Sequence, residues 1–337
     1  MQYSTTLRGS EPIVITIGNF DGIHKGHQGL MREVCSLAKA LDSKPVLVTF
    51  QPHTLKIVRP EIDLRCLTTL EEKLALSKVY GGIADTIVIE FTPAVAAMSA
   101  TEFMNDLRAH FNLRGLVVGV NFSLGHNRMG DVAFLQGYGR EHTIEVRPIQ
   151  LEEIQYQRVS STRIRGLVSE GNVAEARELL GHPVMLNGIV ARGDQRGRLL
   201  GFPTANLIPP VDRLIPANGV YAARVQVRKH TESSDVVHSH CVYIDARMNE
   251  DSTSEQWEEY QSAVNIGVRP TFDGQKRLVE AHLLNVEGLD LYDRCMSIHF
   301  IARLRSEQRF AGLEALKAQI AEDVTNARFI LQKDGQE

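Results

Sequence analysis

The order in which strand-like and helical patterns follow one another changes half-way along this chain of 337 residues. In the first half, short apolar runs typical of buried strands alternate with stretches of helical periodicity. The predicted strands are residues 13–17, 45–50, 86–89, 116–120 and 143–149. The predicted helices are 27–41, 70–80, one with a capping box at Ser99 and Glu102 that runs to Phe111, 162–168 and 173–180. This alternation predicts a mostly parallel, doubly wound sheet, which binds ligands at the carboxyl ends of its strands.

The second half predicts a different architecture, because its strand-like runs follow one another without helices between them. Such spacing favours a small antiparallel β-barrel. One helix closes the chain, and residues 229–261 are polar and predict a flexible excursion between strands. We therefore expect an α/β plus β protein with two domains, 1–184 and 185–337. The predicted barrel strands are 184–191, 220–227, 241–244, 263–267, 278–284 and 296–304, and the apolar face of the last helix is Leu313, Leu316, Ile320, Val324 and Leu331.

Composition narrows the class of protein further. Lys and Arg total 37 against 41 Asp and Glu, a formal net charge of −4, which disfavours a nucleic-acid binder. No apolar run approaches the roughly 18 residues of a membrane span, and the N-terminus carries no secretory signal pattern. Four scattered cysteines, none in a C-x-x-C pair, predict reduced thiols. We expect a cytoplasmic protein without membrane or nucleic-acid partners. The sequence leaves open whether the protein forms a homo-oligomer.

The first candidate site is the glycine-rich turn of residues 18–27, between the first predicted strand and the first helix. Phosphate can bind at such a turn because free backbone N–H groups and the helix dipole converge there. The glycine spacing fits neither the dinucleotide fingerprint nor the P-loop. His24 and His27 can aim both imidazoles at one point and donate hydrogen bonds to oxygens that gain negative charge on a phosphorus. The alternative is a pair of solvated turn histidines.

A second phosphate-binding element is predicted at residues 160–165, which read Ser-Ser-Thr-Arg-Ile-Arg. Hydroxyl groups at a helix N-terminus together with an arginine fork can clamp a phosphate. Taken alone, the same residues also suit a plain helix cap with a solvated basic first turn.

The second half holds another candidate site, in a loop with Gly193, Gly197 and Gly201. Glycines spaced in this way let backbone amides approach a polyphosphate closely. Thr204 and Asn206 follow and offer neutral oxygen ligands that suit Mg²⁺. Strand alternation places Glu280 and His282 on one face, with Val279, Ala281 and Leu283 on the other. The alternatives are an ordinary turn between strands and a surface glutamate.

Three segments of the first half make a family resemblance specific: GNFDGIHKGH (18–27), VVGVNFSLG (117–125) and VSSTRIR (159–165). In this order and spacing they resemble the adenylyltransferase module of bifunctional bacterial riboflavin kinase/FAD synthetases. The resemblance implies transfer of AMP from ATP to FMN, with FAD and pyrophosphate as products. His24 and His27 would stabilise charge on the α-phosphate. The resemblance also implies nucleotide or pyrophosphate contacts from Gly18, Phe20, Asn121, Ser160, Ser161, Thr162 and Arg165, and flavin contacts from Phe50, Pro52 and His53 of the TFQPH segment.

The second half resembles the riboflavin kinase module of the same family, through GFPTAN (201–206), NIGVRPTF (265–272), VEAHLL (279–284) and LRSEQRF (304–310). This resemblance implies that Glu280 takes the proton from the terminal hydroxyl of riboflavin as it attacks the γ-phosphate of ATP. Both reactions would use ATP and Mg²⁺. The implied metal ligands are Thr204 and Asn206, the implied nucleotide contacts are Gly193, Gly197, Gly201 and Pro203, and Arg305 and Phe310 would border the flavin.

Two rival functions remain open at this point. One is a nucleotidyltransferase for another phosphorylated acceptor, with the barrel as an inactive module. The other is a flavin-binding or RNA-binding regulator without catalysis. The Glu280 and Pro203–Asn206 segments argue against the first rival, and the two histidines together with the acidic balance argue against the second.

Overall fold

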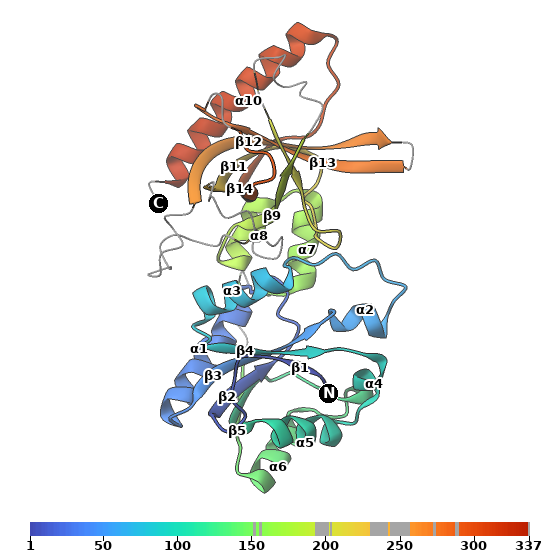
Figure 1. Ribbon diagram of the computed structural model, residues 1–337, viewed down its shortest axis with the longest axis vertical. Coiled ribbons are helices and arrows are strands. Elements are labelled where there is room, and N and C mark those ends of the chain that lie inside the picture. Colours follow the sequence, from blue (N-terminus) through green and yellow to red (C-terminus); the bar gives the residue numbers. More distant parts are fainter. Residues whose placement is uncertain are drawn as a thin grey trace. The chain divides into compact units, whose positions relative to one another are not determined.

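A six-stranded sheet in the order β1-β4-β3-β2-β5-β6 forms the centre of the first half (Figure 1). The structure is a computed structural model that describes residues 1–150, 153–154, 157–192, 202, 204–229, 242, 257–271, 274–286 and 290–335. All neighbouring strands pair in parallel except β1, which is antiparallel to β4. The strands are β1 Tyr3–Ser4, β2 Pro12–Ile17, β3 Lys44–Gln51, β4 Asp85–Glu90, β5 Asn112–Gly119 and β6 Glu145–Ile149.

Helices cover both faces of this sheet, as a doubly wound fold requires. On one face, α1 packs against β2, β3, β5 and the helix α3. On the other face, apolar side chains of α5 and α6 join the core cluster that contains Ile15 and Val48 of the strands. The helices are α1 Lys25–Ala40, α2 Thr54–Val58, α3 Leu70–Gly81, α4 Pro93–Ala97, α5 Ala100–His110 and α6 Val132–His142, with a 3-10 turn η1 at His126–Arg128.

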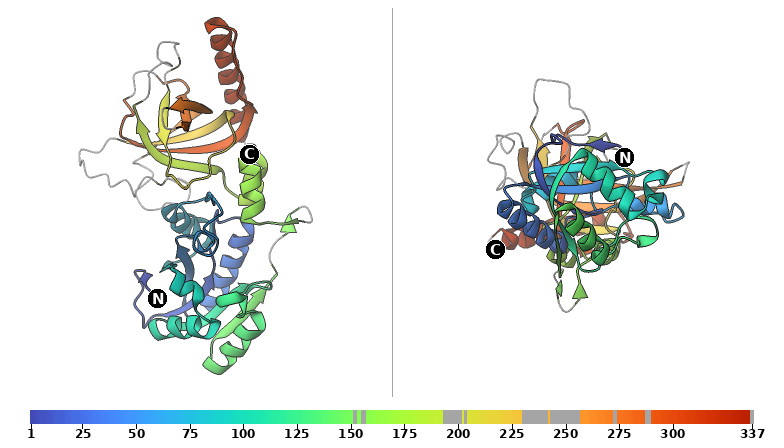
Figure 2. Two further views of the ribbon diagram at one scale, coloured as in Figure 1. Left: turned by 90° about the vertical axis from the view of Figure 1, so that its right-hand side faces the viewer. Right: turned by 90° about the horizontal axis from the view of Figure 1, so that it is seen from below.

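The second half forms a closed barrel in the order β10-β13-β12-β11-β14-β9, and all its strand pairs are antiparallel (Figure 2). The helix α10 (Leu313–Asp334) packs against β11, β12 and β14. The predicted fold class is therefore confirmed. The barrel strands are β9 Val184–Ala191, β10 Ala205–Ile208, β11 Gly219–Arg228, β12 Trp257–Thr271, β13 Gly274–Leu283 and β14 Cys295–Arg305, and the short pair β7 Glu153–Ile154 and β8 Gln157–Arg158 precedes the barrel.

Contacts divide the chain into two compact units, Met1–Ser161 and Thr162–Glu337. Helices α7 (Ser161–Glu170) and α8 (Val173–Leu180) therefore belong largely to the unit that contains the barrel. The structural reason is packing, because α8 lies against β9 and β14. The functional division at 184/185 stays a prediction.

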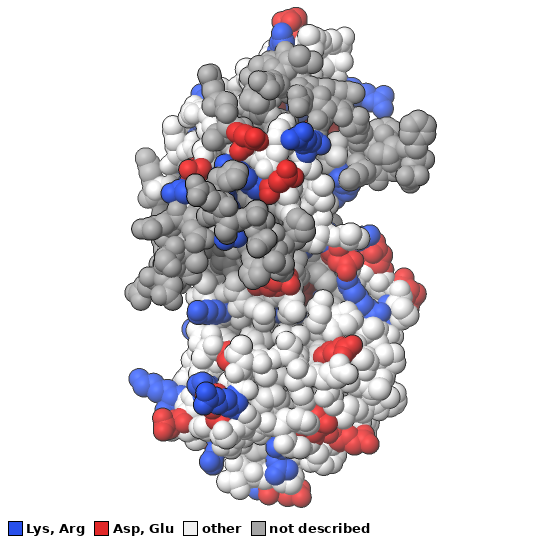
Figure 3. Space-filling model, in the orientation of Figure 1, with Lys and Arg blue, Asp and Glu red and all other residues white. Residues whose placement is uncertain are grey.

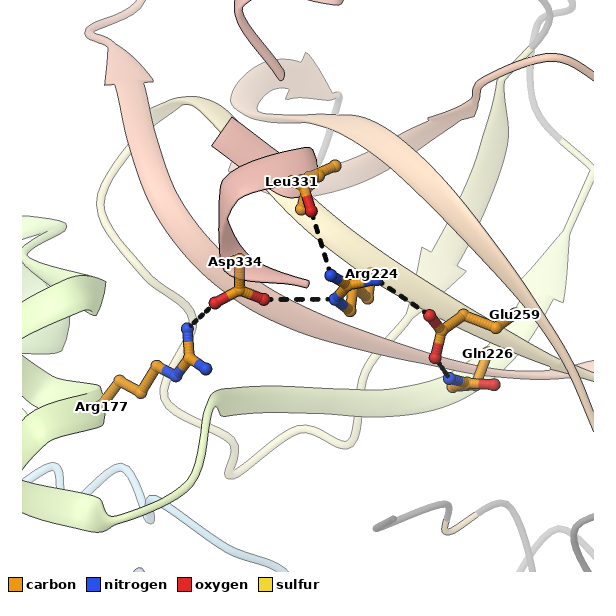
Figure 4. Close-up of polar contacts among 6 residues, drawn as sticks. All are labelled: Arg177, Arg224, Gln226, Glu259, Leu331 and Asp334. Carbon is orange, nitrogen blue, oxygen red and sulfur yellow. Dashed lines mark hydrogen bonds and ion pairs between the residues drawn. The ribbon is translucent and has the colours of Figure 1, made fainter. Parts of the chain in front are cut away.

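A polar network joins the helices of the second unit to its barrel (Figure 4). The carboxylate of Asp334, at the end of α10, pairs with Arg177 of α8 and lies 3.2 Å from Nε of Arg224 on β11. Arg224 also donates to the carbonyl of Leu331 at 3.1 Å and to Glu259 of β12 at 3.0 Å. Because one arginine of β11 contacts both the neighbouring strand β12 and the end of α10, this network fixes α10 against the barrel.

Several expectations for local structure need correction. Strand β10 covers residues 205–208, where no strand was predicted. Residues 257–261, predicted as part of a flexible excursion, begin strand β12. Leu313 is 55% exposed, because the apolar face of α10 meets the barrel only further along, where Val324 and Leu331 are buried. The predicted strand 241–244 lies mostly outside the described residues.

One cysteine also differs from expectation. Cys35 and Cys66 carry thiols, as predicted, but Cys295 at the start of β14 is disulfide-bonded. The scattered positions in the sequence did not reveal this, because a disulfide depends on proximity in the fold rather than on spacing.

Acidic and basic side chains are interspersed over the described part of the surface that Figure 3 shows. The described helices include none with the length and apolar composition needed to cross a bilayer.

Candidate active sites

The histidine loop, residues 18–27, lies at the point of the sheet where successive strands switch from one side of β2 to the other. The chain runs from β2 to β3 on one side of β2, and β5 pairs with β2 on the other side. The loop leaves the carboxyl end of β2, and Gly18 N–H donates to the carbonyl of Val48 on β3 at 3.0 Å. A crevice at such a reversal point is where open α/β sheets bind ligands. The structure thus puts the predicted loop at the predicted edge.

The two predicted histidines contact each other directly. The imidazoles of His24 and His27 stack with ring centroids 3.6 Å apart and an interplanar angle of 16°. His24 is the N-cap of α1, and its Nδ1 accepts a hydrogen bond from the backbone N–H of His27 at 3.3 Å. An accepting Nδ1 carries no proton, so a neutral His24 holds its proton on Nε2. The stacked pair can therefore direct N–H groups to the same side.

The charge state of His27 follows from its surroundings. Burial lowers the pKa of the His27 imidazole well below its ordinary value, and the charges of His24 and Lys73 lower it further. The residue as a whole is half-buried, but its Nδ1 atom is buried and has no hydrogen-bond partner among the described residues. The ring of Phe20 packs edge-on against His27 with centroids 5.1 Å apart. His27 is therefore neutral near pH 7.

The backbone of the loop is held in an unusual conformation. Phe20 and Ile23 have φ angles of 51° and 40°, in the left-handed region that side chains other than glycine rarely adopt. Such strain persists only where surrounding contacts hold it. Here Asp21 supplies those contacts, since its buried carboxylate accepts from the N–H groups of Leu67 and Thr68 at 3.0 Å and from the Thr68 hydroxyl at 3.1 Å. Hydrogen bonds to a charged group are worth roughly 1.5–3 kcal/mol each.

Gly26 explains why a glycine precedes the second histidine. A Cβ atom at this position would lie 3.3 Å from Cε1 and Nδ1 of His24. Gln28 holds the loop from the other side, because its side-chain amide donates to the carbonyl of Ile23 at 2.8 Å. The geometry of the histidine pair thus depends on a small residue at position 26.

The predicted serine element starts at the same loop. Ser161 opens α7 and donates its hydroxyl to the carbonyl of Asp21 at 2.8 Å. Ser160 directly precedes the helix and is half-buried. Thr162 and Arg165 fall in the second unit, and their role at this site stays a prediction.

The other predicted residues of the first unit occupy different environments. Asn121 is exposed and follows the carboxyl end of β5, next to β2 in the sheet. Phe50 is buried in the core, where its ring packs against Phe91 and Phe103. His53 caps α2 by accepting from the N–H of Leu55 at 3.2 Å.

These contacts bear on the predicted flavin residues. The placement of Phe50 favours a packing role over flavin contact. His53 already has a structural role as the N-cap of α2. Pro52 is half-buried beside the carboxyl end of β3.

In the barrel, Glu280 lies in a row of polar residues across three adjacent strands. Asn206 of β10 and Asn265 of β12 are its direct cross-strand partners. The Asn265 amide lies 3.5 Å from a carboxylate oxygen of Glu280. Val279 and Ala281 face the barrel core, whereas Glu280 and His282 are half-buried on the outer face, which confirms the predicted alternation.

The loop before β10 meets the same face of β13. The ring of Phe202 packs edge-on against His282 with centroids 5.4 Å apart. Thr204 directly precedes β10 and, like Asn206, is half-buried. Hydroxyl, amide and carboxylate oxygens are the donors that Mg²⁺ prefers, so this set fits the implied ion. The predicted nucleotide contacts Gly193, Gly197, Gly201 and Pro203 lie outside the described residues.

Arg305 and Phe310, both predicted to border the flavin, lie close together, with the guanidinium 5.7 Å from the ring centroid. The guanidinium is already engaged, however, because it pairs with both oxygens of Asp323 on α10 at 2.8 and 2.6 Å. The pair therefore anchors α10 to β14. If Arg305 contacts flavin, it must do so while its guanidinium remains paired with Asp323.

Sequence reasoning missed the residues that support these sites. Asp21 and Lys73 touch partners far away in the chain, at residues 67–68 and 49. Asn265 belongs to a quoted segment but was given no role. Its position opposite Glu280 depends on strand register, which the sequence pattern does not give.

Comparison with known proteins identifies the family. The family described as FAD synthetase matches residues 7–163, and the family described as riboflavin kinase matches residues 180–331. A bifunctional riboflavin kinase/FMN adenylyltransferase from Escherichia coli (strain K12) is 34% identical over 319 residues, which cover 94% of this chain and 92% of that protein. The chain belongs to this bifunctional family.

Other comparisons agree across the whole length. A bifunctional riboflavin kinase/FMN adenylyltransferase from Pseudomonas fluorescens is 34% identical over 322 residues, with 94% and 92% of the two chains covered. A solved structure described as a macrolide-efflux protein from Streptococcus pneumoniae has a TM-score of 0.79 and 26% identity, and the match covers 95% of this chain and 99% of that one. The predicted family and both predicted enzyme activities are confirmed, and the rival with an inactive barrel is not favoured.

Proposed function

We propose that the two activities of this family member reside in separate units, with AMP transfer at the histidine loop and riboflavin phosphorylation at the Glu280 face. The observation that supports this proposal best is the stacked pair of His24 and His27. A strained loop presents the pair at the carboxyl end of β2, where the strand order reverses. The predicted domains 1–184 and 185–337 are its functional counterparts.

In the first reaction, a phosphate oxygen of FMN attacks the α-phosphorus of ATP, and the bond to the β-phosphate oxygen breaks. FAD forms, and pyrophosphate leaves. His24 and His27 would donate hydrogen bonds from Nε2 to the α-phosphate oxygens, where charge develops. Such a reaction needs positioning and charge stabilisation rather than a protein nucleophile. Further contacts to the nucleotide or pyrophosphate would come from Gly18, Phe20, Asn121, Ser160, Ser161, Thr162 and Arg165.

In the second reaction, the terminal hydroxyl of riboflavin attacks the γ-phosphorus of ATP, and ADP leaves with the bridging oxygen. Glu280 would accept the proton of that hydroxyl, a contribution typically worth about 10²–10⁴ in rate. Thr204 and Asn206 would hold Mg²⁺, which neutralises phosphate charge when bound. The loop with Gly193, Gly197, Gly201 and Pro203 would contact the polyphosphate.

The substrates implied are riboflavin, FMN and ATP. For the flavin we propose contacts near Pro52 and His53 in the first unit, and near Phe310 and Arg305 in the second. A cytoplasmic location is part of the same proposal, because both reactions consume ATP.

The test separates the two activities within one protein. Purified chain is incubated with riboflavin, ATP and Mg²⁺, and the flavin products are separated. We expect His27→Ala to accumulate FMN with little FAD, and Glu280→Ala to lose FMN formation yet convert added FMN to FAD. Equal loss of both activities in a folded variant would refute the assignment to separate units.

A further inference from the structure

Lys73 of α3 is a buried lysine whose side chain lies close to the histidine loop. Only 5% of the residue is exposed. Its ammonium group donates one hydrogen bond, to the hydroxyl of Thr49 on β3 at 3.1 Å. Across the described part of the chain it has no carboxylate within ion-pair distance and no other hydrogen-bond acceptor. Among the described residues, Thr49 is thus the one protein acceptor that the ammonium group contacts.

A purely structural role explains such a residue poorly. Taking an ammonium group out of water costs several kcal/mol, and an apolar side chain of similar volume would fill the same space without that cost. Burial lowers the pKa of Lys73, while the nearby Asp21 and Cys66 act in the opposite direction. Buried groups with perturbed protonation are concentrated at functional sites.

Two connections link Lys73 to the histidine loop. The first is a chain of hydrogen bonds, because the Thr49 hydroxyl donates to the carbonyl of Asn19 at 3.2 Å. The Asn19 side chain in turn binds Thr54, at the start of α2, through two hydrogen bonds of 2.8 and 3.1 Å. Lys73 thus supports the backbone that leads from β2 into the loop.

The second connection is electrostatic. The charged or titratable groups that act on His27 are His24 from the loop and Lys73 from α3. Two imidazoles stacked at 3.6 Å repel each other if both are protonated, and a cation behind them adds to that repulsion. A fixed positive charge also favours the negative phosphates that the site would bind.

We propose that Lys73 is a positioning residue for AMP transfer. Its buried ammonium group fixes the Asn19 segment through Thr49 and adds a positive charge beside the histidine pair. The loop then presents the same N–H donors to the α-phosphate across the physiological pH range. This inference rests on the proposed function of the histidine pair.

The test compares Lys73→Met with Lys78→Met, an exposed lysine on the same helix. For Lys73→Met we expect FAD formation from FMN to fall about tenfold or more, while riboflavin phosphorylation stays unchanged. The acid limb of the pH–rate profile should move to higher pH, because loss of the positive charge raises the pKa of His27. The thermal midpoint should stay level or rise, whereas a structural role predicts that it falls. Lys78→Met should change none of these.

Direct titration of the His27 ring by NMR gives a readout besides activity. We expect His27 to protonate at higher pH in Lys73→Met than in the unchanged protein. Should Lys73→Met fail to fold, Lys73→Gln removes the charge but keeps a donor to Thr49, and the same shifts are expected. An unmoved His27 titration, or FAD formation within twofold of the unchanged protein, overturns the proposal.

A parallel His27→Ala arm keeps this outcome separate from the wider assignment. If His27→Ala retains FAD formation, the proposed site itself is wrong. If His27→Ala is inactive while Lys73→Met and Lys73→Gln are fully active, only the role of Lys73 is wrong.

Discussion

The histidine loop and the Glu280 face differ in how their functional groups are held. In the loop, the backbone has a strained conformation that no regular element would provide. The buried Asp21 carboxylate and the Ser161 hydroxyl hold it in place. On the barrel, strand register alone brings Asn206 and Asn265 beside Glu280. The histidine loop should therefore be sensitive to small changes in backbone conformation and packing. The Glu280 face should be sensitive mainly to the identity of its side chains.

The largest expected effect comes from His24→Asn. Asparagine is a good N-cap, so α1 keeps its capping hydrogen bond while the imidazole donor is lost. Because loss of one such donor typically costs about 10²–10³ in kcat, we expect FAD formation to fall by that factor. Thermal unfolding should stay unchanged.

The matched variant His24→Ala separates capping from chemistry. It should show the same fall in FAD formation together with a loss of about 1 kcal/mol in the free energy of unfolding. If His24→Asn retains full activity, His24 is only a helix cap. The proposed difference between the histidine loop and the Glu280 face would then be wrong.

Gly26→Ala tests whether the loop depends on close packing. The added Cβ would lie 3.3 Å from the His24 ring, so the ring would have to shift by a few tenths of an ångström within the stacked pair. We expect FAD formation to fall roughly tenfold, since displacements of about 1 Å at a site can cost up to 10² in rate. Gly137→Ala in α6, where a Cβ meets nothing closer than 3.9 Å, serves as the control and should leave the rate unchanged. Equal behaviour of the two variants would count against a packed loop.

Asp323→Asn tests the anchor between α10 and the barrel. The change weakens a two-point pairing with Arg305 in which the Asp323 side chain is only 6% exposed. We expect the second unit to lose about 1–3 kcal/mol in the free energy of unfolding, measured in urea, because the half-buried Arg305 guanidinium loses its charged partner. Glu314→Gln, at an exposed pair with Lys317, should have no measurable effect. An Asp323→Asn protein of unchanged stability would leave Arg305 free for another role.

The smallest expected effect concerns acid pH. Burial by itself would raise the pKa of Asp334, but the hydrogen bonds and charges of Arg177 and Arg224 outweigh it and hold the pKa below its ordinary value of about 3.8. A depressed carboxyl pKa stabilises the fold at pH values above the unfolded pKa, and this stability is lost as the pH falls through the folded pKa. Asp334→Asn should therefore lower the urea midpoint at pH 7, and the difference from the unchanged protein should shrink below about pH 4. A difference that does not depend on pH would contradict this assignment.

The sequence predicted more of the fold than of the sites. Regular strands and the capping box at Ser99 and Glu102 were recognisable because local pattern determines them, and the structure confirms both. Helix α6 was missed, since two glycines in its middle weaken the helical pattern. Strand β10 was hidden within the Pro-Thr-Ala-Asn segment.

For the sites, the histidines and Glu280 were recognisable because each lies within a short motif of neighbouring residues in the chain. Asp21, Lys73 and Asn265 were not recognisable, since their partners lie in other elements. Lys73 in particular follows two glutamates in α3 and suggests a solvated helix face until the structure shows it buried.

Each unit of the chain should bind its own ATP molecule. Equilibrium binding of a non-hydrolysable ATP analogue to the full chain, in the presence of Mg²⁺ and the absence of flavins, measures this directly. We expect two analogue molecules per chain at saturation. A single molecule per chain would contradict this expectation.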